Sequence, residues 1–106
     1  MTRLYISGPV TGKPKNNRAA FIRAANVLAD REVLAHIPHM FVPESAEWHD
    51  AMRISINELT DCRFRYDGLA LLPGWEQSEG AKMEKAVAEA CGIPCKTVDE
   101  WLEETR

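Results

Sequence analysis

The sequence has few cysteines, no long apolar run and no excess of basic charge. Its three cysteines, Cys62, Cys91 and Cys95, cannot all pair within one chain, and an odd count is typical of reduced thiols in the cytosol. No apolar stretch approaches the roughly 20 residues that cross a bilayer. The first residues reach Gly8 and Pro9 too soon to hold the apolar core of a signal peptide. We therefore expect a cytoplasmic protein that does not bind membranes.

The charge and composition exclude two further classes. The chain has 13 Lys and Arg against 16 Asp and Glu, a net charge of −3, whereas a nucleic-acid-binding surface normally needs a basic excess. Hydrophobic residues make up 45% and charged residues 27%, close to the average of folded globular proteins, so a disordered chain is not expected. The length of 106 residues fits one domain, residues 1–106.

Short apolar runs alternate with segments of helical spacing along the chain. In the helical segments apolar residues recur every three or four positions, whereas the apolar runs are continuous and end at glycine or proline. The stretch His39–Asp50 has no clear period and is expected to be a long loop. The sequence therefore predicts strands at Leu4–Ile6, Val33–Ile37, Gly68–Leu72 and Ile93–Lys96, and helices over Asn17–Arg31, around Met52, Ile56 and Leu59, from Ser78 to Cys91, and after Thr97, which forms a capping box with Glu100.

This alternation predicts an α/β fold. Strands that alternate with helices form a parallel sheet covered on both faces, with right-handed crossovers. For four strands we expect the small flavodoxin-like, Rossmann-like order 2-1-3-4, which places a crevice between strands one and three at their carboxyl ends. The loops after Ile6 and Leu72 would meet there.

The first of these loops, Ser7–Lys13, is rich in small residues. It lets a ligand approach the backbone, and the helix that follows offers unpaired N–H groups to an anion. It is not a Walker A loop, because only three residues separate Gly8 from Gly12 and Pro14 follows Lys13. An ordinary turn with no ligand is the alternative interpretation.

The second loop leads into a helix with a candidate carboxylate. Ser78 can cap that helix and form an anion-binding nest with the next amides. Gly80 and Glu84 share a helix face, so Gly80 leaves open space before the carboxylate. Such a carboxylate suits attack on a sugar carbon whose phosphate sits in the nest. The alternative is a solvated glutamate paired with Lys82 or Lys85.

Three motifs carry a resemblance to a known family. They are Y-I-S-G-P at Tyr5–Pro9, L-L-P-G-W-E-x-S-x-G-A-x-x-E at Leu71–Glu84, and A-x-x-x-G-I-P at Ala88–Pro94. Together they resemble the DUF4406-like family, small uncharacterised phage and bacterial domains grouped with the nucleoside 2-deoxyribosyltransferases. The resemblance implies a Rossmann-like fold and cleavage of an N-glycosidic bond, without a cofactor, by a nucleophilic Glu84 that Tyr5 orients. It also implies symmetric oligomers, here expected as a dimer through the second and third helices.

Two departures from the relatives refine this expectation. Transferases that act on free nucleosides carry an aspartate where this chain has Ser78, whereas the related 2'-deoxynucleoside 5'-monophosphate N-glycosidases carry a phosphate-binding serine. We therefore expect a nucleotide ligand, because an aspartate would repel a phosphate.

Relatives also place an aspartate on the second helix to protonate the leaving base, where this chain has Ser55, a poor general acid. With Ser55 matched to that aspartate, residues 63–66 look like an insertion. Asp61 and Asp67 are alternative candidates for the general acid, which stays unassigned.

Other side chains complete the predicted site. Trp48, Met52 and Trp75 could stack on a base, and Lys13, Arg18 and Arg53 are either phosphate contacts or ordinary surface charges. His36, His39, His49, Cys91 and Cys95 lack zinc-ligand spacing, and no motif surrounds Cys62, so neither a metal nor a thiol nucleophile is expected. The predicted substrate-binding residues are Ser7, Gly8, Pro9, Gly12, Asp67, Gly74, Trp75, Ser78, Gly80 and Ala81.

The leading hypothesis is a nucleotide N-glycosidase or deoxyribosyltransferase that acts on a nucleoside or deoxynucleoside 5'-monophosphate through Glu84. A non-catalytic protein that senses or sequesters a nucleotide is the alternative, and Ser55 favours it. A third possibility is an interaction module whose pocket is a relic.

Overall fold

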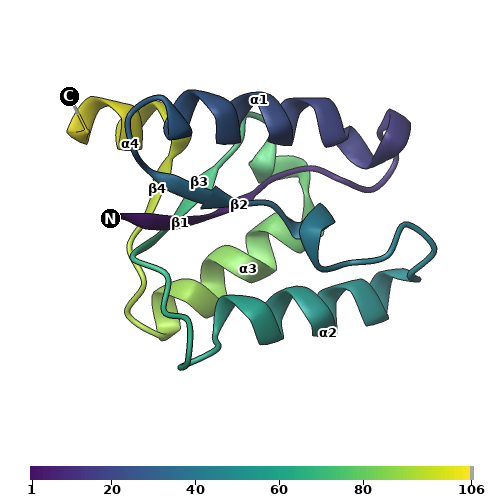
Figure 1. Ribbon diagram of the computed structural model, residues 1–106. Coiled ribbons are helices and arrows are strands. Elements are labelled where there is room, and N and C mark those ends of the chain that lie inside the picture. The colour runs from purple at the N-terminus through teal and green to yellow at the C-terminus, as the bar shows by residue number, and fades with distance from the viewer. Residues whose placement is uncertain (106) are drawn as a thin grey trace.

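The computed structural model describes residues 1–105, which leaves Arg106 of the predicted domain outside the described range. Strands and helices alternate along the chain in the predicted order (Figure 1). The elements are β1 (Arg3–Ser7), α1 (Arg18–Ala29), β2 (Leu34–His36), α2 (Trp48–Leu59), β3 (Gly68–Leu71), α3 (Glu79–Ala90), β4 (Cys95–Thr97) and α4 (Val98–Glu104), with short 3₁₀ turns η1 (Pro14–Asn17), η2 (Pro38–Met40) and η3 (Trp75–Gln77).

The strands form one parallel sheet in the order β2-β1-β3-β4. Tyr5 on the central strand β1 is aligned with His36 of β2 on one side and with Leu69 of β3 on the other. The prediction of a four-stranded α/β fold with order 2-1-3-4 is therefore confirmed. The carboxyl ends of β1 and β3 lie side by side at the point where the strand order reverses, which is where such sheets bind ligands.

Helices cover both faces of the sheet, α1 and α4 on one side and α2 and α3 on the other (Figure 1). Residues of β1 alternate between the two layers, as a strand requires. Leu4 and Ile6 pack with residues of α1 and α4, whereas Tyr5 packs with Leu59 of α2 and Ala88 of α3. The period of two therefore directs Tyr5, and Ser7 two positions later, towards the layer of α2 and α3.

The ends of several elements differ from the sequence prediction. The predicted loop His39–Asp50 ends earlier, because α2 begins at Trp48 and the Glu47 side chain caps it by accepting the amide of Asp50 at 2.9 Å. Within η1 the backbone is left-handed, and α1 begins only at Arg18. The capping box of α4 is present as predicted. Of the helices described in residues 1–105, none combines the length and apolar character needed to cross a bilayer.

Gly68, the first residue of β3, lies directly under the indole of Trp101 on α4. A Cβ atom at this position would be 2.2 Å from Cζ2 and 2.5 Å from Cη2 of Trp101. The indole cannot move freely, because its Nε1 donates a hydrogen bond to the Leu69 carbonyl at 2.9 Å. The absence of a side chain at Gly68 is therefore a packing requirement of the core.

We expect Gly68→Ala to lower the free energy of unfolding by roughly 1–3 kcal/mol, the usual range for overpacking a core. Urea denaturation of the wild type and the variant measures this change. The penalty should be smaller in a Trp101→Phe background, because phenylalanine lacks the second ring that the new methyl group would meet. An equal penalty in both backgrounds would contradict this explanation.

Candidate functional site

A buried carboxylate lies at the carboxyl edge of β1. Glu84, one and a half turns into α3, is only 5% exposed. Its Oε1 accepts a hydrogen bond of 2.6 Å from the Ser7 hydroxyl, and its Oε2 accepts one of 2.9 Å from the Tyr5 hydroxyl. The alternative of a solvated glutamate is therefore wrong, and the two lysines proposed for it pair elsewhere, Lys82 with Glu79 and Lys85 with Glu89.

Burial and hydrogen bonding act in opposite directions on this carboxylate. Burial raises the pKa of Glu84 above its ordinary value, while the hydrogen bonds donated by Ser7 and Tyr5 lower it. Burial, together with the neighbouring charge of Glu84, raises the pKa of Tyr5 well above its usual value. Tyr5 therefore keeps its proton at neutral pH and remains a donor to the carboxylate.

The second loop places a capped helix end beside Glu84. Ser78 is extended, with φ −104° and ψ 116°, and its Oγ accepts the amide of Ala81 at 3.2 Å. Gly74 turns the chain after β3 with φ +88°, a conformation that favours glycine. The serine hydroxyl and the start of α3 therefore lie at the rim of the site.

The two loops lie against each other, as the fold prediction requires. The Leu72 amide donates to the Ser7 carbonyl at 2.9 Å, which extends the pairing of β1 and β3 to their ends. A Cβ atom at Gly8 would be 2.7 Å from Cβ of Leu72, so only glycine permits this close approach. The Asn17 side chain donates to the Pro9 carbonyl at 2.8 Å and fastens the first loop to the start of α1.

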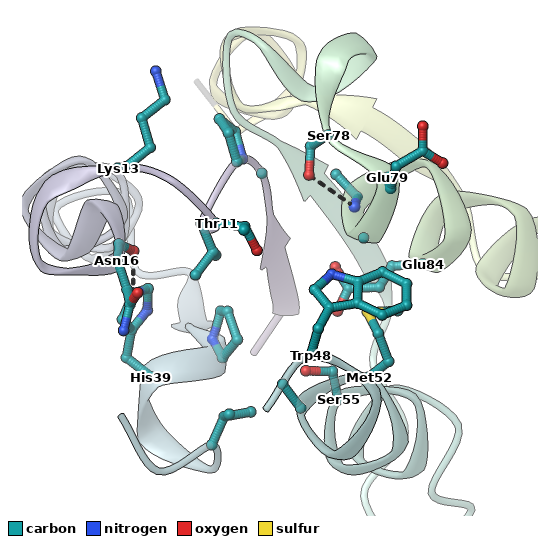
Figure 2. Close-up of a pocket in the computed structure, with 18 of the residues that line it drawn as sticks. Thr11, Lys13, Asn16, His39, Trp48, Met52, Ser55, Ser78, Glu79 and Glu84 are labelled. Carbon is teal, nitrogen blue, oxygen red and sulfur yellow. Dashed lines mark hydrogen bonds between the residues drawn. The ribbon is translucent and has the colours of Figure 1, made fainter. Parts of the chain in front are cut away.

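A cavity of about 870 Å³ opens where these loops meet, and Glu84 and Ser78 both line it. Its walls come from both loops, η1 and the start of α1, η2 and the segment that follows it, α2, and the start of α3. Figure 2 shows Ser78 and Glu84 on one side, residues of α2 below them, and the first loop across the hollow. The labelled residues of these other walls are Thr11, Lys13, Asn16, His39, Trp48, Met52 and Ser55.

The space in front of Gly80 is narrower than the sequence indicated. A Cβ atom at Gly80 would be 3.3 Å from the Sδ atom of Met52, so the thioether of α2 lies against this glycine. The expectation of fully open space before Glu84 is corrected, because α2 and α3 pack against each other across Gly80. A methionine is flexible, and its side chain forms a movable wall of the cavity.

Four of the predicted substrate-binding residues do not line the cavity: Asp67, Trp75, Gly12 and Ser7. Asp67 lies at the opposite edge of the sheet, where it accepts the amide of Arg3 at 2.8 Å. Trp75 packs on the core beside Tyr5, with the Lys85 ammonium 5.5 Å from its ring centre, and Gly12 is exposed. Ser7 and Tyr5 are fully buried and act on the site through Glu84. The remaining predicted residues do line the cavity: Gly8, Pro9, Gly74, Ser78, Gly80 and Ala81.

Several cavity residues were not predicted as ligand contacts. Thr11, Asn16, His39, Glu44 and Gln77 line it. Their positions depend on backbone turns that carry no pattern in the sequence, above all the three successive left-handed residues 15–17. The only available signal was the absence of a period around His39–Asp50, which marked a loop near the site. Of the cationic candidates, Lys13 and Arg18 line the cavity, whereas Arg53 pairs with Asp50 on the exposed side of α2.

The histidines have separate partners. His36 contacts the Tyr66 hydroxyl, His39 contacts the Asn16 carbonyl, and His49 contacts Glu47. Within residues 1–105, no three His, Cys, Asp or Glu side chains are grouped in a way that could hold a metal ion.

The raised pKa of Glu84 predicts a pH-dependent stability. Because the folded-state pKa is higher than the unfolded one, the stabilising contribution of Glu84 is complete at low pH and is lost as pH rises through the folded-state value. Glu84→Gln keeps the shape without the charge. Its free energy of unfolding should rise relative to that of the wild type as pH increases above about 4.5, the ordinary value of a glutamate, as measured by urea denaturation. A difference in the free energy of unfolding that does not change with pH would show that the pKa of Glu84 is the same in the folded and unfolded states.

Comparison with known proteins identifies the family. A search of curated proteins finds no match to this chain. The family model described as "Domain of unknown function (DUF4406)" matches residues 2–97, a range that includes both loops and all three motifs. The chain, with its buried glutamate between two sheet-edge loops, therefore belongs to the DUF4406 family.

Proposed function

We propose that this protein is a nucleotide N-glycosidase or deoxyribosyltransferase that acts on a nucleoside or deoxynucleoside 5'-monophosphate. The observation that carries the proposal is the Glu84 carboxylate, which lines a large cavity and has both oxygens held by buried hydroxyls. A carboxylate that is buried and oriented in this way is arranged for nucleophilic attack rather than for surface charge. The resemblance of the motifs to those of the nucleoside 2-deoxyribosyltransferases also supports Glu84 as the nucleophile.

The reaction has two displacement steps. A Glu84 oxygen forms a bond to C1' of the sugar while the bond from C1' to the base nitrogen breaks, and its electron pair leaves with the base. The resulting sugar ester is then displaced by water or by a second base, which regenerates the carboxylate with overall retention. Tyr5 and Ser7 hold Glu84 in place for the attack, because each donates to one of its oxygens.

The rim of the cavity suits the 5'-phosphate. Ser78 and the first amides of α3 provide hydrogen-bond donors, and Lys13 and Arg18 bring positive charge to the same cavity. Glu79, in the first turn of α3, pairs with Lys82, which offsets its charge next to this rim. The apolar side chains of Trp48 and Met52 form a wall against which a base can stack.

The leaving base needs a proton, and α2 does not offer a carboxyl for it. Ser55 lines the cavity, at the position where the resemblance implies an aspartate. Asp61 is bound by Arg63 outside the cavity lining, and Asp67 lies at the far edge of the sheet. Glu44, on the segment before α2, lines the cavity, and we propose it as the donor. A base that leaves without protonation bypasses this step and should be the better substrate.

This function predicts base release that depends on Glu84. Incubation with deoxynucleoside monophosphates, followed by chromatography, should detect free base, and release from a 7-methylguanine nucleotide should be faster because that base leaves unprotonated. Glu84→Gln should lower the rate at least 10³-fold for both, since the nucleophile is lost. Glu89→Gln, on the exposed side of the same helix, is the matched control and should retain the rate. Equal rates for wild type and Glu84→Gln would end the proposal.

The phosphate assignment predicts a selective effect of Ser78→Asp. Aspartate is as good a helix cap as serine, so α3 should remain stable, but its charge repels a phosphate at the rim. The variant should lose at least tenfold in kcat/KM for the 5'-monophosphate and retain activity on the nucleoside without a phosphate. Comparable losses on both substrates would place the phosphate elsewhere.

The alternative is a nucleotide-binding protein without turnover, and Ser55 in place of an acid favours it. In that case the protein binds nucleotides tightly, releases no base from either substrate, and retains or improves binding in Glu84→Gln.

The dimer through α2 and α3 stays a prediction. Trp48 and Met83, on those helices, are exposed apolar side chains that such an interface would cover.

A further inference from the structure

Tyr66 is buried behind Tyr5, on the side away from the cavity. It belongs to the segment between α2 and β3, which resembles an insertion relative to related sequences, yet its side chain is only 6% exposed. The rings of Tyr5 and Tyr66 meet edge to face, with centroids 5.5 Å apart and planes at 83°. Tyr66 does not line the cavity, so any effect it has on the site passes through Tyr5.

The Tyr66 hydroxyl is fixed by two partners from different elements. It donates a hydrogen bond of 2.6 Å to Oε2 of Glu58 on α2. Nδ1 of His36, on β2, lies 2.9 Å from the same hydroxyl oxygen. Because the hydroxyl has a single proton and donates it to Glu58, His36 must carry a proton on Nδ1 and act as the donor. The network therefore assigns the tautomer of His36.

The network keeps this arrangement across neutral pH. Burial, and then the hydrogen bond to Glu58, raise the pKa of Tyr66, so its hydroxyl stays protonated. Burial and the nearby Arg3 lower the pKa of His36, against the opposite effect of Glu58, so the imidazole stays neutral. Glu58, His36, Arg3 and, more weakly, Asp61 are the charged or titratable groups that act on this cluster.

We propose that Tyr66 is a positioning residue: anchored by Glu58 and His36, it holds the Tyr5 ring so that the Tyr5 hydroxyl meets Glu84. Tyr5 is fully buried, and without the edge contact its ring could tilt into the space left behind. The Tyr5 hydroxyl would then no longer hold Oε2 of Glu84. The effect on Glu84 is independent of the proposed function, and only its catalytic consequence rests on that function.

The consequence is a measurable change at Glu84. The hydrogen bond from Tyr5 lowers the pKa of Glu84, so losing it raises that pKa. The groups that face Glu84 are the hydroxyls of Tyr5 and Ser7 from β1, and Tyr5 in turn is influenced by Ser55 from α2 and by Tyr66. Because these hydroxyls are neutral at physiological pH, a shift in Glu84 reports the loss of the hydrogen bond rather than a new charge.

The test is a titration of the Glu84 side-chain carboxyl by carbon NMR in the ligand-free protein. Tyr5→Phe sets the full shift, upward by about one unit, the size expected for one hydrogen bond to a charged group. Tyr66→Leu should give most of that shift, and Tyr66→Phe, which keeps the ring but loses its anchor, a smaller part. Phe64→Leu, an exposed aromatic residue of the same segment, is the control and should give none.

Nitrogen NMR of the His36 ring provides an independent readout in the wild type. In the wild type, Nδ1 should carry the proton. In Tyr66→Phe this preference for a proton on Nδ1 should be lost, because the hydroxyl that accepts from Nδ1 is absent. Tyr66→Phe keeps the aromatic ring and so provides the test if Tyr66→Leu does not fold. An unprotonated Nδ1, or an unshifted Glu84 pKa in folded Tyr66→Leu or Tyr66→Phe, would overturn the proposal. In the base-release assay the variants should lower kcat with little change in KM. Absence of base release in the wild type would count against the proposed function while leaving both NMR results to decide this inference.

Discussion

The site depends on one interaction, the capture of a buried carboxylate by two hydroxyls of the central strand. Glu84 would be costly to bury alone, and the hydrogen bonds from Tyr5 and Ser7 offset that cost. The arrangement follows from strand geometry, because residues two apart on β1 point to the same face and α3 crosses that face. Burial nevertheless raises the pKa of Glu84, because the two hydrogen bonds offset only part of the cost of burying its charge.

The topology of the sheet gives this carboxylate a cavity. The strand order reverses between β1 and β3, so the loops that follow them diverge to opposite faces and leave a hollow at their carboxyl ends. Gly8 permits these loops to approach closely beneath the hollow, and Ser78 caps the helix that carries Glu84. A buried carboxylate, a set of hydrogen-bond donors and an apolar wall are thus brought together by the connections between the strands, and not by any one segment.

Sequence reasoning succeeded where local rules apply and failed where distant segments meet. The helix and strand order, and the capping box of α4, were predictable because hydrophobic period and turn residues act over a few positions. The prediction for Asp67 was wrong even though it directly precedes the predicted strand Gly68–Leu72, because the start of a parallel strand lies at the edge opposite to the site. Trp75 belongs to the second loop in sequence, but its ring packs on the core, and no local pattern records this.

By itself, the sequence determined the parallel α/β architecture, the edge of the sheet where the crevice lies, and the place of Glu84 on a helix that begins at that edge. Only the tertiary structure decided that Glu84 is buried, that Met52 narrows the space before it, and that Tyr66 supports Tyr5 from behind. The physical reason is separation along the chain. The Tyr5–Glu84 hydrogen bond joins residues 79 positions apart, and no local pattern records how such segments pack.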